Sequence, residues 1–331
     1  MLIVRCGKLI VATEPKQLEM LEILRQKASA NGLKGEDALR WLSEDEVRAM
    51  EPEVSSVGAL LSPSTGIVDV HELMLALQGE AEAHGATVAL SSPVVDGCVL
   101  PGGGGGGGIV PAGGRLRIST PDLDLEADEV VNCAGLEATA VAGAIAGVPR
   151  ESLPTAYVAK GNYFGLAAKS PFSMLVYPVP EAAGLGVHAT IDLAGRCRFG
   201  PDVEWLDATQ PWDYRVDSSR ADSFYAEVRK YWPALPDGAL VADYAGARPK
   251  VQAPGEPARD FVVQTEAEHG VPGLINMFGI ESPGLTSSMA LAQLVEAVLS
   301  SRVGGPSGRS SEGRTAVAAW LESRDDELDF R

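Results

Sequence analysis

The stretch FGIESPGLTSS, residues 278–288, joins an apolar segment to a segment with helical periodicity. The residues before it, 273–278, are apolar as in a buried strand. After it, apolar side chains recur at helical spacing over about 286–300. We therefore predict a strand, a turn that contains glycine and proline, and a helix that begins at Thr286 or one residue earlier.

The start of this helix is a candidate ligand site, and a plain connection between strand and helix is the alternative interpretation. The first N–H groups of a helix have no intrahelical partners and carry the positive end of its dipole. A ligand that holds or develops negative charge is stabilised there by about 0.3–1 kcal/mol. Gly279 and Gly284 lack a Cβ atom, so a flat ligand can approach the backbone closely.

Outward from this stretch, the pattern alternates between helical and strand-like segments, which predicts an α+β or mixed α/β fold. Capping residues mark two helix starts: Ser43 opens a capping box with Glu46, and Asp69 precedes an apolar helical face. Helices are predicted near 18–28, 43–51, 69–85, 138–146 and 219–232. Strands are predicted at 1–12, 86–90, 94–99, 115–120, 129–135 and 260–263, and segments of an antiparallel sheet at 157–158, 162–166, 175–179, 186–191 and 196–200.

Seven consecutive glycines, Gly102 to Gly108, satisfy the text pattern GxGxxG of a phosphate-binding turn. Such a turn needs a strand before it, a helix straight after it and an acidic residue about 20 positions further on. Pro101 precedes the run and Pro111 follows it, so no helix starts there. We predict a flexible hairpin insertion over 101–114 instead.

The charge of the chain excludes several classes of partner. The 331 residues include 27 Lys and Arg against 45 Asp and Glu, a net charge of −18. This field repels polyanions on average, so nucleic acid and anionic membranes are poor partners, although one local arginine can still hold a small anion. No apolar run reaches the roughly 18 residues of a membrane-spanning helix. The four cysteines and four histidines form none of the spacings typical of zinc sites, so no metal is expected.

Residues 278–288 resemble the flavin loop of the FAD-dependent oxidoreductases of the D-amino-acid-oxidase-like superfamily, in particular their L-2-hydroxyglutarate dehydrogenase branch. Six further stretches agree with that family in the same order along the chain, so the resemblance covers roughly residues 4–300. They are CGKLIVA (6–12), SP with TGIVD (62–69), VNCAGL (131–136), YPVP (177–180), LGVH with GP (185–188 and 200–201), and GARPK (246–250).

This resemblance implies FAD as the cofactor and assigns residues to it. The backbone of Val94 would meet the adenine, and the small residues Cys133, Ala134 and Gly135 would pass close to the pyrophosphate. The start of the last helix would face the ring edge that gains negative charge on reduction, and its dipole would favour the reduced flavin. The residues implied to wrap the isoalloxazine are Gly279, Ile280, Glu281, Ser282, Pro283, Gly284, Leu285 and Thr286.

The resemblance also implies a substrate site for a short 2-hydroxy acid, oxidised by hydride transfer to the flavin. Arg248 is the expected carboxylate clamp, because its planar guanidinium binds a carboxylate through two hydrogen bonds; a surface ion pair is the alternative. His188 is expected to bind or deprotonate the hydroxyl, with a structural histidine as the alternative. Tyr163 and Tyr177 are further substrate-binding candidates, whereas His71, His84 and His269 are expected to face solvent.

The family opens with a βαβ unit that carries GxGxxG and a histidine beside the flavin, and this sequence contains neither before its first strand. We therefore expect a truncated member with an incomplete FAD-binding Rossmann-like domain and an antiparallel-sheet substrate domain. Its segments would be 1–66 (substrate domain), 67–149 (FAD-binding domain), 150–250 (substrate domain), 251–300 (return to the FAD-binding domain) and 301–331 (flexible tail).

Three readings of function stay open at this point. The first is FAD-dependent oxidation of L-2-hydroxyglutarate to 2-oxoglutarate, with an electron acceptor that the sequence does not name. The second is a related amine or glycerol-phosphate oxidase of the same fold. The third is a non-catalytic remnant that acts at most as a binding module. Because eukaryotic members of the branch are mitochondrial, the resemblance implies that location.

Overall fold

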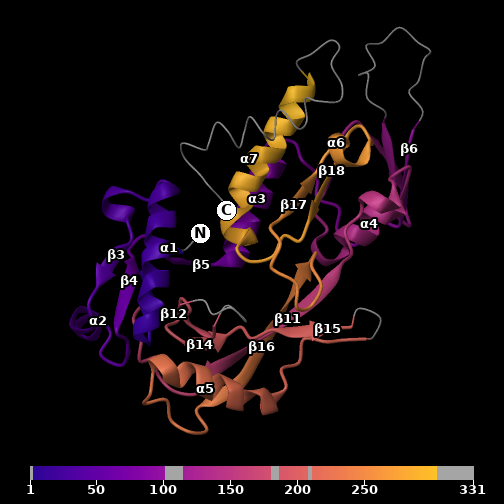
Figure 1. The fold of residues 1–331 in the computed structure, drawn as a ribbon. Helices are drawn as coiled ribbons and strands as arrows, with labels where there is room; N and C mark the ends of the chain where they lie inside the picture. The colour runs from indigo at the N-terminus through magenta and orange to yellow at the C-terminus, as the bar shows by residue number, and fades with distance from the viewer. Residues whose placement is uncertain (1–2, 101–114, 180–185, 208–210, 304–331) are drawn as a thin grey trace.

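The computed structural model of the protein describes residues 3–100, 115–179, 186–207 and 211–303 (Figure 1). The predicted glycine-rich insertion and the predicted tail beyond Val303 lie outside these residues, as do Pro180 and Leu185 of two family motifs. The strands that flank the insertion, β6 (Asp96–Val99) and β7 (Leu116–Ser119), pair antiparallel.

The described residues form a mixed α/β fold, as predicted. The helices are α1 (Leu18–Ala30), α2 (Glu44–Met50), α3 (Val70–Ala83), α4 (Ala138–Ala144), α5 (Ala221–Tyr231), α6 (Glu266–His269) and α7 (Gly284–Val303). The other strands are β1 (Ile3–Val4), β2 (Lys8–Ala12), β3 (Arg40–Leu42), β4 (Gly58–Ser62), β5 (Ile67–Val68), β8 (Asp124–Ala127), β9 (Val130–Asn132), β10 (Ile145–Ala146), β11 (Tyr157–Leu166), β12 (Leu175–Pro178), β13 (His188–Ile191), β14 (Cys197–Gly200), β15 (Glu204–Leu206), β16 (Leu240–Lys250), β17 (Val262–Gln264) and β18 (Leu274–Phe278).

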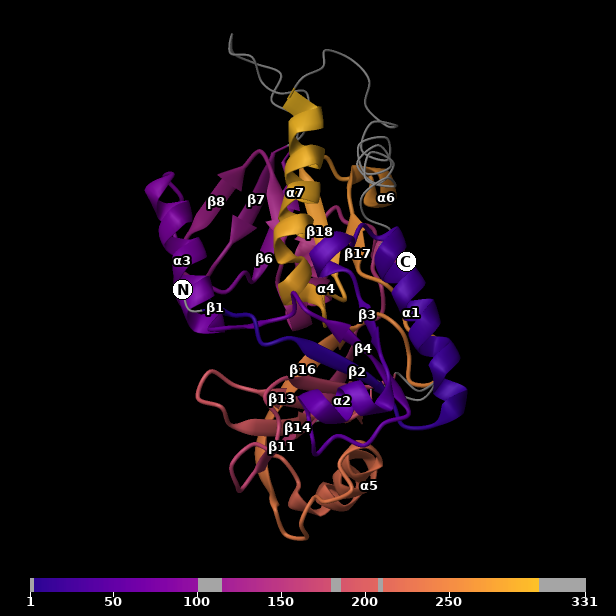
Figure 2. The same cartoon turned by 90° about the vertical axis from the view of Figure 1, so that its left-hand side faces the viewer.

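Within the described residues, a nine-stranded sheet joins the start of the chain to its middle. Its order is β15-β11-β14-β13-β12-β2-β4-β3, and β16 pairs with β11. Strand β2 runs parallel to β12 on one side and antiparallel to β4 on the other, so it is fixed by backbone hydrogen bonds along both edges. Helix α5 packs on β14 and β16 at the lower end of Figures 1 and 2, where Phe224, Val228 and Tyr231 are fully buried.

Three smaller sheets accompany the nine-stranded sheet in the described residues, and the smallest is the antiparallel pair of β1 and β5. Strand β18 pairs in parallel with β9 and antiparallel with β17, while β6, β7, β8 and β10 form a four-stranded sheet. All five residues of β18 are buried, as expected for a strand covered on both faces. Figures 1 and 2 both show α7 beginning near the junction of these smaller sheets with the nine-stranded sheet.

Local sequence signals located several elements correctly. Ser43 accepts from the Glu46 N–H, the Glu46 carboxylate accepts from the Ser43 N–H, and Asp69 caps α3. The predicted strand at 86–90 is wrong: this segment is irregular, and no strand in the described part of the chain pairs with it. Its Leu90 is 82% exposed. The alternation of apolar and polar residues in this segment therefore did not produce a strand, because no neighbouring strand of the described chain pairs with it.

The prediction that His269 faces solvent is also wrong, since its side chain is 3% exposed. His269 ends α6, and Gly270 follows in the left-handed conformation at φ 71°. This turn directs the chain back so that His269 Nδ1 accepts a hydrogen bond from the Val271 N–H at 3.1 Å. Turn residues alone therefore did not reveal that the imidazole packs inward. His71 and His84 are exposed, as expected.

The paired glycines of β11 and β16 generate a prediction on stability. Gly161 and Gly246 are direct cross-strand partners, but a Cβ on Gly161 would lie 2.8 Å from Pro201 Cβ, whereas one on Gly246 would meet nothing within 4 Å. We expect Gly161→Ala to lower the free energy of unfolding by about 1–3 kcal/mol through overpacking. The matched Gly246→Ala variant should stay within about 1 kcal/mol of the parent. Equal losses for the two variants in urea unfolding would contradict this account.

Candidate functional site

A cavity of about 330 Å³ lies where the nine-stranded sheet meets the turn before α7. Its volume falls within the range typical of small-molecule sites. The described residues that line it combine aromatic, apolar and basic side chains with one hydroxyl from the turn, and none of them is acidic. They are Lys8, Ile10, Leu24, Tyr163, Tyr177, Pro178, His188, Pro201, Arg248, Ser282 and Pro283.

Neighbouring strands place the aromatic wall of the cavity. Val176 of β12 is paired with Ala189 of β13, so the antiparallel register brings Tyr177 opposite His188. Their rings stack in parallel with centroids 3.7 Å apart, at an interplanar angle of 7°. The ammonium of Lys8, from the adjacent β2, lies 5.1 Å from the centre of the Tyr177 ring. Burial raises the pKa of Tyr177, so its phenol stays protonated at neutral pH.

Arg248 reaches the cavity from β16 and is tied to the turn that precedes α7. Its Nη1 lies 3.3 Å from Glu281 Oε2, and the other oxygen of that carboxylate accepts a hydrogen bond from Lys250. The side chains of Arg248, Lys250 and Glu281 are 18%, 15% and 12% exposed, so this is a largely buried cluster rather than a surface ion pair. Because a guanidinium has five N–H donors, Arg248 can hold Glu281 and still donate to a ligand.

Tyr163 stands beside Arg248 on the neighbouring strand. Its ring stacks on Tyr244 with centroids 4.6 Å apart and an interplanar angle of 7°. Burial raises the pKa of Tyr163, while the positive charge of Arg248 acts in the opposite direction. The phenol is therefore held as a neutral hydrogen-bonding group near the guanidinium.

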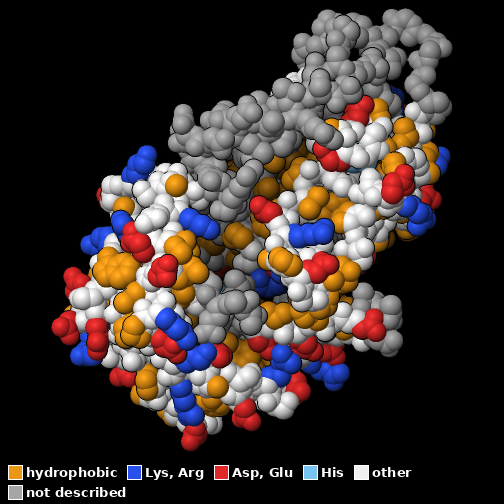
Figure 3. Space-filling model, in the orientation of Figure 1, with side chains coloured by type: hydrophobic (Ala, Val, Ile, Leu, Met, Phe, Trp, Pro, Cys, Tyr) orange, Lys and Arg blue, Asp and Glu red, His pale blue; other side chains and the backbone are white. Residues whose placement is uncertain are grey.

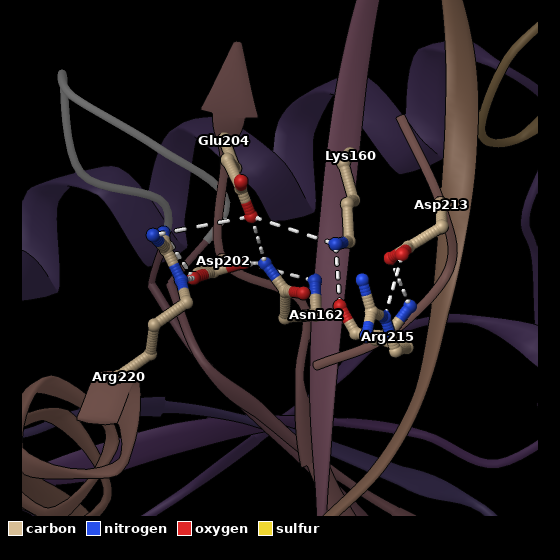
Figure 4. A network of polar contacts seen from close by, with 7 residues as sticks. All are labelled: Lys160, Asn162, Asp202, Glu204, Asp213, Arg215 and Arg220. Atoms are coloured by element: carbon tan, nitrogen blue, oxygen red, sulfur yellow. Dashed lines mark hydrogen bonds and ion pairs between the residues drawn. The ribbon is translucent and has the colours of Figure 1, made fainter. Parts of the chain in front are cut away.

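A partly buried polar network lies next to the cavity wall at Pro201 (Figure 4). The fully buried Asn162 donates from Nδ2 to Asp202 Oδ1 at 3.0 Å and to Glu204 Oε2 at 2.9 Å. Arg220 binds the other oxygen of Asp202 at 2.5 Å, and the Lys160 ammonium lies 4.0 Å from Glu204. Asn162 and Arg220 thus each bind one carboxylate oxygen of Asp202, the residue after Pro201. These contacts hold Pro201 in place at the cavity wall.

The turn 279–283 carries the chain from the buried β18 into α7. Gly279 has φ 67°, a conformation that favours glycine, and helix α7 begins at Gly284. Of the segment 279–286 that the family resemblance assigns to the isoalloxazine, Ser282 and Pro283 line the cavity. The Glu281 side chain is held by Arg248 and Lys250, and Leu285 is 50% exposed.

The residues assigned to adenine and pyrophosphate lie on other elements and do not line the cavity. Val94 is in the irregular segment before β6 and is 36% exposed. Cys133, Ala134 and Gly135 follow β9, and a Cβ added to Gly135 would meet nothing within 4 Å, so the backbone there is open to close approach. The turn is fixed by Asn132, whose side chain accepts from the Ala134 N–H and donates to Asn276.

Sequence reasoning missed Lys8 as a site residue. It stands in the stretch CGKLIVA, which was recognised as a motif without a role for the lysine. The signal was available, because Lys8 is the one charged residue in an otherwise apolar strand, and a charged group in a buried strand usually has a partner or a ligand. The sequence could not predict that the Lys8 side chain faces a cavity, because the alternation of residue types along one strand does not indicate which face of the sheet carries the site.

The residues present fit a flavin at the cavity. Ser282, Pro283 and the guanidinium of Arg248 border a partly apolar space, and α7, with the positive end of its dipole, begins at the residue after Pro283. The small residues after β9 leave room for a phosphate to approach the backbone. Comparison with known families agrees with this chemistry: the sequence pattern of the family described as FAD dependent oxidoreductase (DAO) matches residues 1–297.

The chain belongs to this family. Among curated relatives of this DAO-family chain, the mitochondrial L-2-hydroxyglutarate dehydrogenase of Arabidopsis thaliana is 42% identical over 87% of the chain. The glycerol 3-phosphate dehydrogenase of Caloramator mitchellensis is 29% identical over 89% of the chain. The chain spans 65% of the length of the first relative and 56% of the second.

Solved structures share the fold of this DAO-family chain. An L-alpha-glycerophosphate oxidase from Mycoplasma pneumoniae, with FAD bound, superposes with a TM-score of 0.71 at 20% identity and covers 88% of this chain and 72% of its own. A glycine oxidase from Geobacillus kaustophilus gives 0.65 at 19% identity, with coverages of 89% and 71%. Across the described residues, no helix has the length and apolar character needed to span a bilayer.

The cluster around Glu281 generates a prediction on stability. We expect Glu281→Gln to lower the free energy of unfolding by about 2–3 kcal/mol, because it leaves two largely buried cations without their counter-ion. The control is Glu22→Gln, which removes a carboxylate from an exposed pair with Arg25. It should leave the unfolding curve in guanidinium chloride unchanged within error. A Glu281→Gln protein as stable as the control would show that this cluster does not hold the turn to the sheet.

Proposed function

We propose that this chain carries the substrate site of an FAD-dependent dehydrogenase that oxidises L-2-hydroxyglutarate to 2-oxoglutarate. The observation that carries the proposal is one cavity that Arg248, His188 and the turn immediately before α7 all line. A carboxylate, a hydroxyl and a flavin edge need these three features within reach of one another. The name of the Arabidopsis relative, at 42% identity, supports this choice of substrate, and we propose the same mitochondrial location.

Three residues of the cavity have a defined task in the proposed reaction. Arg248 binds the C1 carboxylate through its free N–H donors and so orients the carbon that bears the hydroxyl. His188 accepts the hydroxyl proton, and its ring is held in place by the stack on Tyr177. Tyr163, held neutral by burial, donates a hydrogen bond to the substrate from beside Arg248. A bound FAD would supply the acceptor for the hydride of C2; with the hydroxyl proton taken by His188, the alcohol would lose two electrons and two hydrogens and become a ketone.

The cofactor would be held by two parts of the chain. Ser282, Pro283 and the first N–H groups of α7 would contact the ring, together with the backbone from Gly279 to Thr286. The open backbone at Cys133, Ala134 and Gly135 would contact the pyrophosphate, and Val94 the adenine. The task of the start of α7 is to stabilise the negative charge that the ring gains on reduction.

The proposal is tested by turnover with a panel of substrates. The full chain, purified with added FAD, is assayed with an artificial electron acceptor on L-2-hydroxyglutarate, sarcosine and glycerol 3-phosphate. We expect the visible absorption of a bound flavin and turnover of L-2-hydroxyglutarate. Preference for sarcosine or glycerol 3-phosphate would assign the chain to the amine or glycerol-phosphate branch, and a colourless protein without turnover would favour a non-catalytic remnant.

Arg248 provides the first variant prediction for this reaction. We expect Arg248→Gln to lower kcat/KM for L-2-hydroxyglutarate about a hundredfold, because it removes two charge-assisted hydrogen bonds to the carboxylate. Arg248→Lys should retain part of the activity, since it keeps the charge but not the paired geometry. The control is Arg215→Gln, at a side chain that is 90% exposed, and it should behave as the parent. Unchanged kcat/KM in Arg248→Gln would rule out the clamp.

His188 provides the second variant prediction for this reaction. We expect His188→Phe to keep the ring stack on Tyr177 while it removes the proton acceptor, so kcat should fall about a hundredfold or more. The KM for L-2-hydroxyglutarate should change little, because carboxylate binding belongs to other residues. If kcat is retained and only the melting temperature changes, His188 is structural.

A further inference from the structure

Lys8 lines the same cavity as Arg248 but comes from a strand far from that of Arg248 in the sheet order. It begins β2, where Leu175 of β12 and Ser62 of β4 are its register partners on either side. Arg248 lies on β16, which is separated from β2 by the strands β11, β14, β13 and β12 of the same sheet. Both side chains nevertheless line one cavity, so the two basic groups approach the same space from distant strands.

No carboxylate lies within ion-pair distance of the Lys8 ammonium among the described residues, and the ammonium lies over the ring of Tyr177. The other basic side chains of this region have acidic partners: Arg248 and Lys250 share Glu281, and Lys160 lies near Glu204. This is unusual in a chain that carries 45 acidic residues against 27 basic ones. Burial lowers the pKa of Lys8, because desolvation disfavours its charged form.

The geometry points to Lys8 as the residue that binds the second carboxylate of a dicarboxylic 2-hydroxy acid. This inference rests on the proposed function and defines its substrate class. Arg248, tied to the turn before α7, holds the carboxylate beside the carbon that is oxidised, and Lys8 holds the carboxylate at the far end of the chain. A cavity with two separated cations and no acidic lining among the described residues favours a ligand with two separated negative charges.

A monocarboxylic 2-hydroxy acid offers Lys8 no carboxylate, and none of the described residues supplies one. The desolvation of this half-buried ammonium is then not offset by the ligand, so such a ligand binds less tightly than the dicarboxylate. Discrimination by an unpaired polar group in the site is typically stronger than discrimination by size alone. Lys8 would therefore set the preference for dicarboxylic over monocarboxylic 2-hydroxy acids. Arg248 and His188 bind the C1 carboxylate and the hydroxyl, which both classes of ligand have.

Binding of two unreactive acids to the full chain tests this without turnover. Glutarate and valerate have the same carbon chain and differ in the distal carboxylate. By titration calorimetry we expect glutarate to bind about tenfold or more tightly than valerate, and Lys8→Met to abolish most of this preference. Methionine keeps an unbranched side chain over the Tyr177 ring. Lys8→Arg should restore the preference in part, and the control Lys16→Met, at a 78% exposed side chain, should leave it unchanged.

A second measurement needs no variant. Reductive methylation of lysines, read by mass spectrometry on the unmodified sequence, should show that glutarate protects Lys8 and valerate does not. Lack of protection, equal binding of the two acids, or an unchanged preference in Lys8→Met would each overturn the inference. Tighter binding of glycerol 3-phosphate than of glutarate would overturn it as well, because the site would then prefer a phosphate.

Turnover separates this inference from the proposed function. With L-2-hydroxyglutarate and L-2-hydroxyvalerate as substrates, we expect Lys8→Met to raise KM about tenfold or more for the first and to leave the second unchanged. Turnover of L-2-hydroxyglutarate with an unchanged preference in Lys8→Met would retain the function and reject Lys8. Lys8-dependent binding of glutarate without any turnover would retain Lys8 and reject the function.

Discussion

The ion cluster of Arg248, Lys250 and Glu281 is the interaction on which the site depends. It joins β16 of the nine-stranded sheet to the turn between β18 and α7, two parts of the chain that otherwise belong to separate sheets. The cluster fixes both the direction of the guanidinium and the position of the helix start. Because it is largely buried, removing one member leaves an uncompensated charge, and the cavity cannot rearrange without that penalty.

The charge of the cavity is opposite to that of the molecule. Acidic and basic side chains are interspersed over the lower part of the surface in Figure 3, and the chain as a whole carries −18. The described residues that line the cavity nevertheless include Lys8 and Arg248 and no carboxylate. An anionic ligand is therefore repelled on average at a distance and attracted at the site, so selectivity comes from short-range contacts rather than from steering.

The aromatic stacks and the polar network beside the cavity fix the positions of its lining side chains rather than contribute binding energy directly. Tyr177 orients His188 through a parallel stack, and Tyr244 does the same for Tyr163. The network of Asn162 with Asp202 and Glu204 holds the wall at Pro201. A substrate site that must place a hydroxyl next to a flavin needs this kind of rigid surround, since small displacements of a reacting group cost much of the rate.

The sequence by itself determined the mixed α/β class, the capped starts of α2 and α3, the strand-turn-helix at 278–288 and the family. These features are set by local hydrogen bonding and periodicity, which a single segment contains. Only the tertiary structure decided that 86–90 is irregular, that His269 is buried, and that Lys8, His188 and Arg248 face one cavity. Those outcomes depend on pairing and packing between segments far apart in the chain: β2 lies beside β12, about 165 residues away, because of register and burial that no local pattern records.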